Sequence, residues 1–149
     1  MVRKDVFQLQ LINVTNEEEL SEAFRIRKAV FVEEQKVPLE DEFDQHDALA
    51  RHVLVIWENQ SVATGRLRVI SDIAKLERIC VLADWRQKGL GRVIVRGLEA
   101  IAEKEGLKKF KLHAQTHAIG FYNTLGYEAS SPEFMEDGIP HVVMLKNPD

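Results

Sequence analysis

The chain has 149 residues, 45% hydrophobic and 30% charged, and its 20 basic and 24 acidic side chains give a net charge of −4. These values predict one domain over residues 1–149, and the mild acidity argues against non-specific nucleic-acid binding, which relies on clustered positive charge. The apolar runs are too short for a membrane span, and the N-terminus is too polar for a signal peptide. The one cysteine, Cys80, cannot form an intrachain disulfide. We therefore expect a cytoplasmic protein.

A strand and a helix are predicted at the N-terminal end. Residues 7–12 alternate apolar and polar side chains, as half-buried strands do. Thr15 and Glu18 have the spacing of a capping box, and a helix with a broad apolar face follows. Val37-Pro38 is expected to end it, because proline disfavours the helical conformation in its predecessor.

Three strands are predicted next. Residues 52–58 and 62–70 predict a hairpin with its turn at Asn59-Gln60. A third strand over residues 75–81 follows a turn at Ser71-Asp72.

The second half of the chain alternates helices and strands. A helix over about residues 92–105 is followed by Gly106 as a left-handed cap. A strand over 109–115 places His113 on the face opposite to its apolar side chains. A short helix over 118–125, closed by Gly126, leads to final strands over 127–129 and 139–145, with a turn at Asp137-Gly138. This order predicts an α+β fold with helices on both faces of a mixed sheet.

The segment between the third of these strands and the long helix is typical of an anion-binding loop. Its sequence is Arg86-Gln87-Lys88-Gly89-Leu90-Gly91-Arg92. The glycines allow a close approach to the backbone, the first helical turn leaves N–H donors unpaired, and the cations favour a phosphate. A P-loop would need a lysine followed by Ser or Thr, and a dinucleotide fingerprint a third glycine where Ile94 stands. The remaining pattern is Gln/Arg-x-x-Gly-x-Gly/Ala, with an ordinary glycine-containing turn as the alternative.

Together with two other segments, this loop resembles the GNAT superfamily, the Gcn5-related N-acetyltransferases. Residues 76–81 precede the loop as the family's central strand does, and residues 118–127 are similar to its late A-x-x-F-Y-x-x-x-G-F/Y helix. Segments 30–38, 42–44 and 138–141 are similar to the ElaA/YjcF-type bacterial branch. The resemblance implies a single-domain GNAT fold, with a mostly antiparallel twisted sheet of about six to seven strands and about four helices on both faces.

The resemblance also implies acetyl-CoA as cosubstrate. Its diphosphate would meet the loop amides, and its pantetheine arm would pair with the strand backbone. Gln115 stands where many relatives carry Asn. The residues that the resemblance assigns to the cofactor are Ile79, Cys80, Val81, Arg86, Gln87, Lys88, Gly89, Leu90, Gly91, Arg92, Gln115 and Phe121. Packing alone predicts for Cys80 a small buried side chain rather than a nucleophile.

Two residues are expected to carry the chemistry. Tyr122 is predicted to protonate the departing thiolate, and its alternative is an ordinary tyrosine of the apolar stripe. Glu77 is the leading candidate for the general base, because strand alternation places it among apolar neighbours on the face of Ile79 and Val81, where burial would raise its pKa. The alternatives are an ion pair with Arg78, Lys75 or Arg66, or a strand bulge that reverses its face. The main-chain N–H of Val81 is the expected oxyanion donor.

The acceptor side is less well determined. Residues 40–47 hold five carboxylates, and Glu42 and Asp44 would form an electronegative rim for a cationic amine, unless the run is a solvated loop. His141 would orient substrate or relay a proton, or else be a structural histidine. The five histidines lack the spacing of a metal site, so no metal is expected.

The functional prediction is direct acetyl transfer, within a ternary complex, from acetyl-CoA to a primary amine of a small molecule or peptide. A non-catalytic acyl-CoA sensor and a phosphate-binding enzyme of another fold are the alternatives. No nucleic-acid or membrane partner is expected, and pairing of exposed strand edges into a homodimer stays open.

Overall fold

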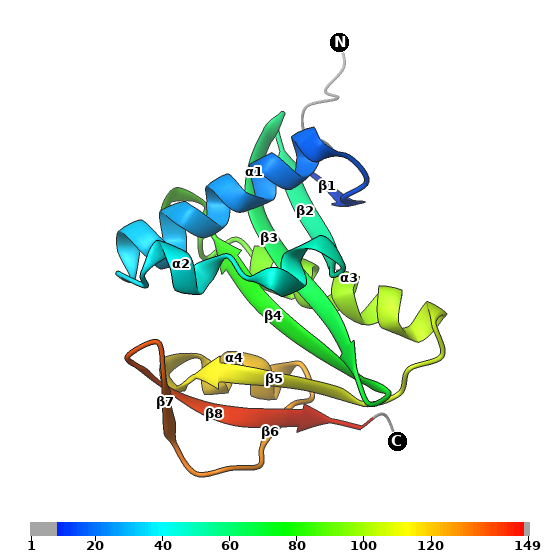
Figure 1. Ribbon diagram of the computed structural model, residues 1–149. Coiled ribbons are helices and arrows are strands. Elements are labelled where there is room, and N and C mark those ends of the chain that lie inside the picture. Colours follow the sequence, from blue (N-terminus) through cyan, green and yellow to red (C-terminus); the bar gives the residue numbers. More distant parts are fainter. Residues whose placement is uncertain (1–8, 148–149) are drawn as a thin grey trace.

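The computed structural model describes residues 9–147, so Phe7 and Gln8 of the first predicted strand lie outside the described residues. Its centre is an eight-stranded open sheet in the order β1-β2-β3-β4-β5-β8-β6, with β7 paired to β8 (Figure 1). The strands are β1 Leu9–Asn13, β2 Arg51–Trp57, β3 Gln60–Ile70, β4 Ile73–Val81, β5 Phe110–Gln115, β6 Glu128–Ala129, β7 Phe134–Glu136 and β8 Ile139–Lys146. Within residues 9–147 only β4 and β5 pair in parallel.

The predicted α+β class with a mostly antiparallel sheet is confirmed, but the strand number was too low. The added strand is β7, whose three residues are too few for an alternating pattern to show in the sequence.

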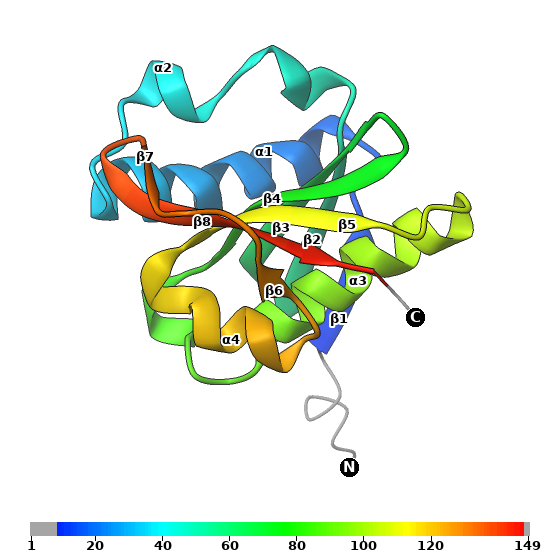
Figure 2. The ribbon, with the colours of Figure 1, turned by 90° about the horizontal axis from the view of Figure 1, so that it is seen from below.

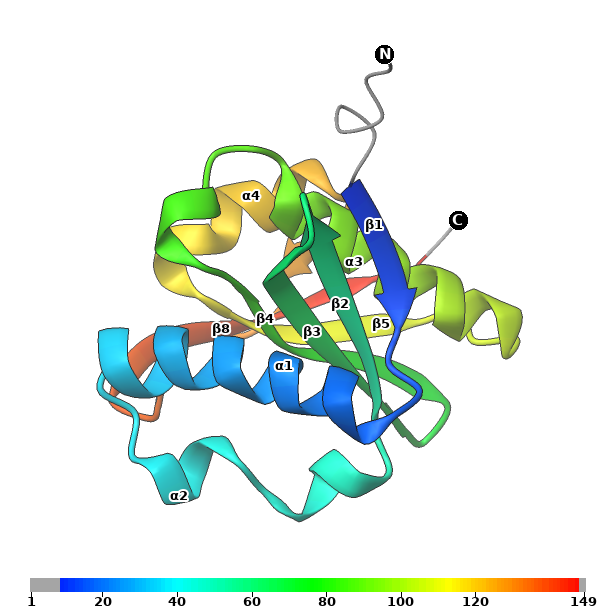
Figure 3. The same cartoon turned by 90° about the horizontal axis from the view of Figure 1, so that it is seen from above.

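Helices cover both faces of the sheet (Figure 2). The helical elements are α1 Glu17–Arg27, the π-helix Lys28–Glu34, α2 Leu39–Glu42, α3 Leu90–Lys104 and α4 Ile119–Thr124, with 3₁₀ turns at Gln45–Ala48, Ala83–Trp85 and Thr116–Ala118. The first three lie on one face and α3 with α4 on the other, and Figure 3 shows α1 crossing the strands opposite α3. Among residues 9–147, none of the helices has the length and apolar character that crossing a membrane requires.

Two local predictions need correction. The N-cap of α1 is Asn16 rather than Thr15: the Asn16 side chain accepts the Glu19 N–H at 2.8 Å, and the Glu19 carboxylate accepts the Thr15 N–H at 2.8 Å. The hairpin turn lies at Glu58 and Asn59, whose φ angles of 53° and 67° give the left-handed pair that a tight hairpin requires.

The hydrophobic core lies on both sides of the sheet. On the α3 side, Ile94 and Leu98 are fully buried, and a Cβ at Gly65 would lie 2.5 Å from Ile94, so only glycine permits this close approach. On the α1 side, Ile26 packs with Cys80, which is 5% exposed. Cys80 is therefore the small buried residue that its position predicted.

A bulge in β4 determines where the site forms. Arg66 of β3 pairs with Glu77, whereas Thr64 pairs with Cys80, so β4 holds one residue more than β3 between these pairs. Arg78 takes up the extra length with a left-handed φ of 56°. A bulge bends its strand and reverses the face of the residues beyond it.

Next to this bulge the sheet opens. The last residues that pair between β4 and β5 are Leu76 and Leu112. Beyond them the two strands diverge, as Figure 1 shows between the upper strands and β5. The carboxyl-terminal half of β4 thus has an edge without a strand partner.

Candidate active site

A cleft of about 690 Å³ occupies the opening between β4 and β5. It is lined from both strands, from the π-helix, α2 and α4, and from the β7–β8 turn. The sequence-predicted residues that line it are Glu42, Asp44, Glu77, Ile79, Cys80, Val81, Arg86, Gln115, Phe121, Tyr122 and His141. Residues 87–92, which form the predicted anion loop, do not line the cleft, but Gly91 lies against the ring of Phe121, which does.

The anion loop has the conformation that its glycines predict. Gly89 is the N-cap of α3 with φ of 80°, and a Cβ at Gly91 would stand 3.2 Å from the Phe121 ring. The Val93 N–H bonds to the Gly89 carbonyl at 3.3 Å, so the donors of the preceding residues lie at the free end of the helix. The exposed side chains of Lys88 and Arg92 add positive charge. These groups fit a diphosphate.

Arg86 is placed differently from the prediction. Its guanidinium bonds to the carboxylate of Glu34 at 2.6 and 2.7 Å and to the carbonyl of Val81 at 2.9 Å. The hydrogen bond from Arg86 lowers the pKa of Glu34. The Arg86 side chain, which was predicted to bind a phosphate, instead connects the π-helix to the end of β4.

Tyr122 is directed into the cleft from α4. Tyr122 is 9% exposed. Among residues 9–147, no hydrogen bond to its hydroxyl shifts its pKa. Burial raises the pKa of Tyr122, and the nearby Cys80 adds to this rise. The phenol therefore keeps its proton at neutral pH and can donate it to a stronger base.

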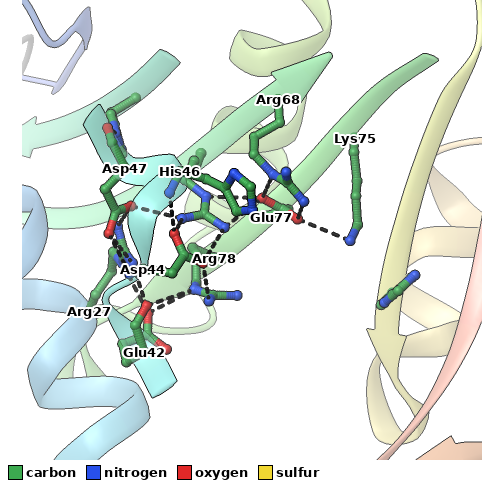
Figure 4. A network of polar contacts seen from close by, with 12 residues as sticks. Arg27, Glu42, Asp44, His46, Asp47, Arg68, Lys75, Glu77 and Arg78 are labelled. Carbon is green, nitrogen blue, oxygen red and sulfur yellow. Dashed lines mark hydrogen bonds and ion pairs between the residues drawn. The ribbon is translucent and has the colours of Figure 1, made fainter. Parts of the chain in front are cut away.

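Glu77 does not have the apolar environment of the leading prediction. The two alternatives, an ion pair with Arg66 or Lys75 and a strand bulge that reverses its face, are confirmed. The bulge turns it away from the face of Ile79, toward α2, where its carboxylate meets Arg66 at 2.7 Å, Arg68 at 2.9 Å and Lys75 at 3.0 Å (Figure 4). Burial raises the pKa of this carboxyl, but the hydrogen bond from Arg68 and the charges of Arg66 and Lys75 outweigh it and bring the pKa to about 2. The expected rise in pKa is wrong, and a carboxylate this acidic is a poor proton acceptor at neutral pH.

Glu40 and Asp41 of the acidic run are exposed, but Glu42 and Asp44 are held by arginines. Glu42 is 2% exposed and contacts Arg27 at 2.9 Å and Arg78 at 3.1 Å. Asp44 contacts Arg66 at 2.8 Å and Arg78 at 3.3 Å. Burial raises the pKa of Glu42 in spite of its arginine partners, whereas the pKa of Asp44 is lowered because its arginines outweigh burial. Because arginines pair with both carboxyls, the predicted electronegative rim is wrong for Glu42 and Asp44. Burying ionised carboxylates requires such partners, because an unpaired buried charge is strongly unfavourable.

Two other carboxylates of the cleft, Asp41 and Asp137, have no ion-pair partner within residues 9–147. Burial raises the pKa of Asp137. The positive charge of Arg78 opposes this rise, and the negative charges of Glu136 and Asp41 add to it. Asp41 belongs to the acidic run that the sequence singled out, whereas Asp137 was predicted only as part of a turn.

The predicted polar residues of β5 and β8 are held by hydrogen bonds. Gln115 accepts from Gln35 at 3.4 Å, donates to it at 3.1 Å, and lies 2.8 Å from the His117 ring. His141 is 6% exposed, with Nδ1 2.7 Å from the Ile139 carbonyl. Because a carbonyl only accepts, the neutral His141 ring carries its proton on Nδ1.

The sequence did not predict one hydrogen-bonded pair of side chains in the cleft, His113 and Glu136. His113 of β5 lies with Nδ1 2.8 Å from Oε1 of Glu136 on β7, and its ring packs edge-on against Phe134. Sequence alternation placed His113 on the polar face of its strand, but β7 was not predicted, so no partner could be named for it.

Residues 9–147 contain no group of three or more His, Cys, Asp or Glu side chains arranged to hold a metal ion. The groups that the cleft region offers for chemistry are the phenol of Tyr122, an imidazole paired with a carboxylate, and backbone donors of β4 and α3.

Comparisons with known proteins agree with this geometry. A family model described as an acetyltransferase (GNAT) domain matches residues 13–148. The Bacillus subtilis protein YyaT is 54% identical over 93% of this chain and 95% of its own length. The Bacillus subtilis N-acetyltransferase YjcF is 41% identical over 93% of this chain and all of its own length. YyaT and YjcF are themselves uncharacterized.

Solved structures share the fold. Escherichia coli ElaA superposes with a TM-score of 0.83 at 23% identity and covers 93% of this chain and 99% of its own. The PaiA N-acetyltransferase of Thermoplasma acidophilum, solved in complex with coenzyme A, has a TM-score of 0.67 at 15% identity and covers 93% of this chain and 99% of its own. At these identities the likeness shows the fold alone.

Proposed function

Because the chain belongs to the GNAT acetyltransferase family, we propose that it transfers the acetyl group of acetyl-CoA to a primary amine by direct attack within a ternary complex. The observation that carries the proposal is the cleft at the β4–β5 opening, which joins the unpaired edge of β4 to Tyr122 and, through Phe121, to the anion loop. When bound, acetyl-CoA supplies the acetyl group as a reactive thioester.

The anion loop and the edge of β4 are the proposed holding groups. Backbone N–H groups of Leu90, Gly91 and Arg92, with the charges of Lys88 and Arg92, would hold the diphosphate. Residues 79–81, which β5 leaves unpaired, offer main-chain donors and acceptors to an extended pantetheine arm, as an exposed strand edge does to a peptide. The complex of PaiA with coenzyme A shows that a protein of this fold binds the ligand, and so supports the proposal.

The main-chain N–H of Val81 is the proposed oxyanion donor. The Leu82 N–H bonds to the Val62 carbonyl at 2.9 Å, which makes the neighbouring pair of Val81 and Ala63 a non-hydrogen-bonded pair. The N–H and carbonyl of Val81 therefore point away from β3, toward the opening. The bond that its carbonyl accepts from Arg86 has this direction.

Tyr122 is the proposed acid. Its buried phenol is still protonated when the carbon–sulfur bond breaks, and transfer of that proton to the sulfur prevents the thiolate from re-attacking the amide. A positioned general acid contributes about 10²- to 10⁴-fold to a rate.

For the acceptor, we propose a cationic amine that enters at Asp41 and Asp137. Their unpaired carboxylates would attract an ammonium group to the mouth of the cleft. This assignment replaces the rim that the sequence placed at Glu42 and Asp44.

A thiol-release assay with a panel of amines tests the function. We expect release of coenzyme A by the wild type, and a kcat about 100-fold lower in Tyr122→Phe. Thr124→Val, which removes a hydroxyl that bonds within α4 rather than in the cleft, is the matched control and should keep the wild-type rate. Equal rates in wild type and Tyr122→Phe would exclude the acid role. Tight binding of coenzyme A without release by any amine would favour the acyl-CoA sensor.

A further inference from the structure

We propose that His113, oriented by Glu136, is the residue that takes the proton from the acceptor amine. This inference rests on the proposed acetyl transfer and names its missing base. His113 would be a catalytic residue, and Glu136 a positioning residue that acts through it.

The first support is the position of His113 at the opening. Leu112 makes the last pair between β5 and β4, so His113 is the first residue of β5 beyond the contact of the two strands. The side chains of Leu112 and Ala114 are buried in the core with Tyr122. His113 alternates with them, faces the opposite side of the sheet and lines the cleft. The acid and the imidazole thus approach the same opening from its two sides.

The second support is the hydrogen bond from Nδ1 to Glu136. An ionised carboxylate only accepts hydrogen bonds, so the 2.8 Å contact places a proton on Nδ1 and leaves the lone pair of the neutral ring on Nε2. The hydrogen bond from His113 lowers the pKa of Glu136, which keeps this carboxylate charged. The charge stabilises the imidazolium that forms when Nε2 accepts a proton, as in a carboxylate–histidine pair of a hydrolase.

The ring is also held in place by its neighbours. The Phe134 ring packs edge-on against His113, with ring centroids 5.2 Å apart. The Phe134 ring also stacks on His141, with ring centroids 6.1 Å apart. A base that is fixed in orientation loses little entropy when the amine arrives.

Other groups of the cleft are less suited to accept the proton. Glu77 is surrounded by Arg66, Arg68 and Lys75. Nε2 of His141 has no hydrogen-bond partner among residues 9–147, but its Nδ1 bonds to a neutral carbonyl, which stabilises an imidazolium less than a carboxylate does. The charged and titratable residues that line the cleft with His113 are Asp41, Glu42, Asp44, Arg66, Arg68, Lys75, Glu77, Arg78, Cys80, Arg86, His117, Tyr122, Glu136, Asp137 and His141.

The proton balance is complete with these residues. The acceptor arrives as an ammonium ion, and Nε2 of His113 takes one proton, which leaves a neutral amine with its lone pair free. The nitrogen–carbon bond forms as the carbon–sulfur bond breaks, and Tyr122 protonates the sulfur. The nitrogen loses a second proton, which restores Tyr122, and His113 releases its proton to solvent. One proton stays on the amide, one on the thiol, and one is released.

The kinetic test compares His113→Gln, Glu136→Gln and His141→Gln over pH 5–9. We expect His113→Gln to lower kcat/KM about 100-fold and to remove the acidic limb of its pH profile, as loss of a general base does. Glu136→Gln should lower kcat/KM about tenfold, because the amide holds the ring but lacks the charge. The acidic limb should persist in His141→Gln. His46→Gln, outside the cleft, is the control for loss of a histidine.

A second measurement does not depend on turnover. Nitrogen-15 shifts of the imidazoles in the protein without ligands should show His113 as the Nδ1–H tautomer, and Glu136→Leu should abolish this preference. An Nε2–H tautomer in the wild type would overturn the proposal, as would an acidic limb that survives in His113→Gln. Failure of the wild type to release thiol with every amine would instead refute the proposed function.

Discussion

Replacement of Glu77 by glutamine tests whether this residue is a base or an internal counter-charge. The pKa of Glu77 is about 2, against 4.5 for an ordinary glutamate. A tenfold change in acidity corresponds to about 1.4 kcal/mol, so loss of the charge should lower the free energy of unfolding at pH 7 by on the order of 3 kcal/mol. The burial of Glu77, whose side chain is 8% exposed, limits screening by solvent.

The effect should depend on pH with a defined sign. Because the pKa of Glu77 is lower in the folded state, its stabilisation is complete above the ordinary value of 4.5 and is lost as the pH falls toward about 2. Urea unfolding of wild type and Glu77→Gln at constant ionic strength, from pH 7 to pH 2.5, measures this difference. The other carboxylates titrate in both proteins, so the comparison isolates Glu77.

The control and the activity assay complete the experiment. Glu103→Gln removes an exposed carboxylate of α3 and should change stability by less than about 0.5 kcal/mol. The folded Glu77→Gln protein should keep its kcat within about threefold of the wild type, far from the 10²-fold or greater loss of a missing base. A stability difference below about 1 kcal/mol at pH 7, or a kcat that falls 100-fold in the folded variant, would refute the reasoning.

Two further predictions concern the anion loop and a buried histidine. Gly89→Ala should destabilise the fold by about 1 kcal/mol, because alanine disfavours the left-handed φ of 80°, and should weaken coenzyme A binding in calorimetry, whereas Gly120→Ala on α4 should not lower stability. An unchanged affinity in Gly89→Ala would contradict a role of this turn in binding. Burial lowers the pKa of His52 below its ordinary 6.5, so the folded state resists protonation of this ring. The free energy of unfolding of the wild type should therefore fall as the pH drops below 6.5. In thermal unfolding between pH 7 and pH 5, His52→Gln should show a weaker dependence of stability on pH.

The sequence by itself determined the parts of the protein that depend on local chemistry. The predicted left-handed cap at Gly106 is confirmed, and the predicted turn at Ser71-Asp72, helix end at Gly126 and bend at Gly89 also have positive φ angles. Helix and strand periodicity likewise identified α3 and β5, because a periodic pattern depends only on which side chains of one segment are buried together. These local features, with the family's motifs, were enough for the fold class.

The sequence could not decide which residues of different segments meet, and it left the ion pair of Glu77 with Arg66 or Lys75 as one alternative among several. The bulge at Arg78 reverses the face of Glu77, and no periodic pattern marks one extra residue in a strand. The arginine partners of Glu42 come from α1 and β4, 15 and 36 residues away, and the side chain of His113 finds Glu136 at a separation of 23 residues.

Tertiary structure alone decided the protonation chemistry for the same reason. The acidity of a carboxyl depends on the few charges within hydrogen-bonding distance, and electrostatic interaction in a buried site falls steeply once solvent intervenes. Burial of Glu77, visible in its sequence context, favoured a neutral acid. The cations that the fold brings to it reversed that outcome.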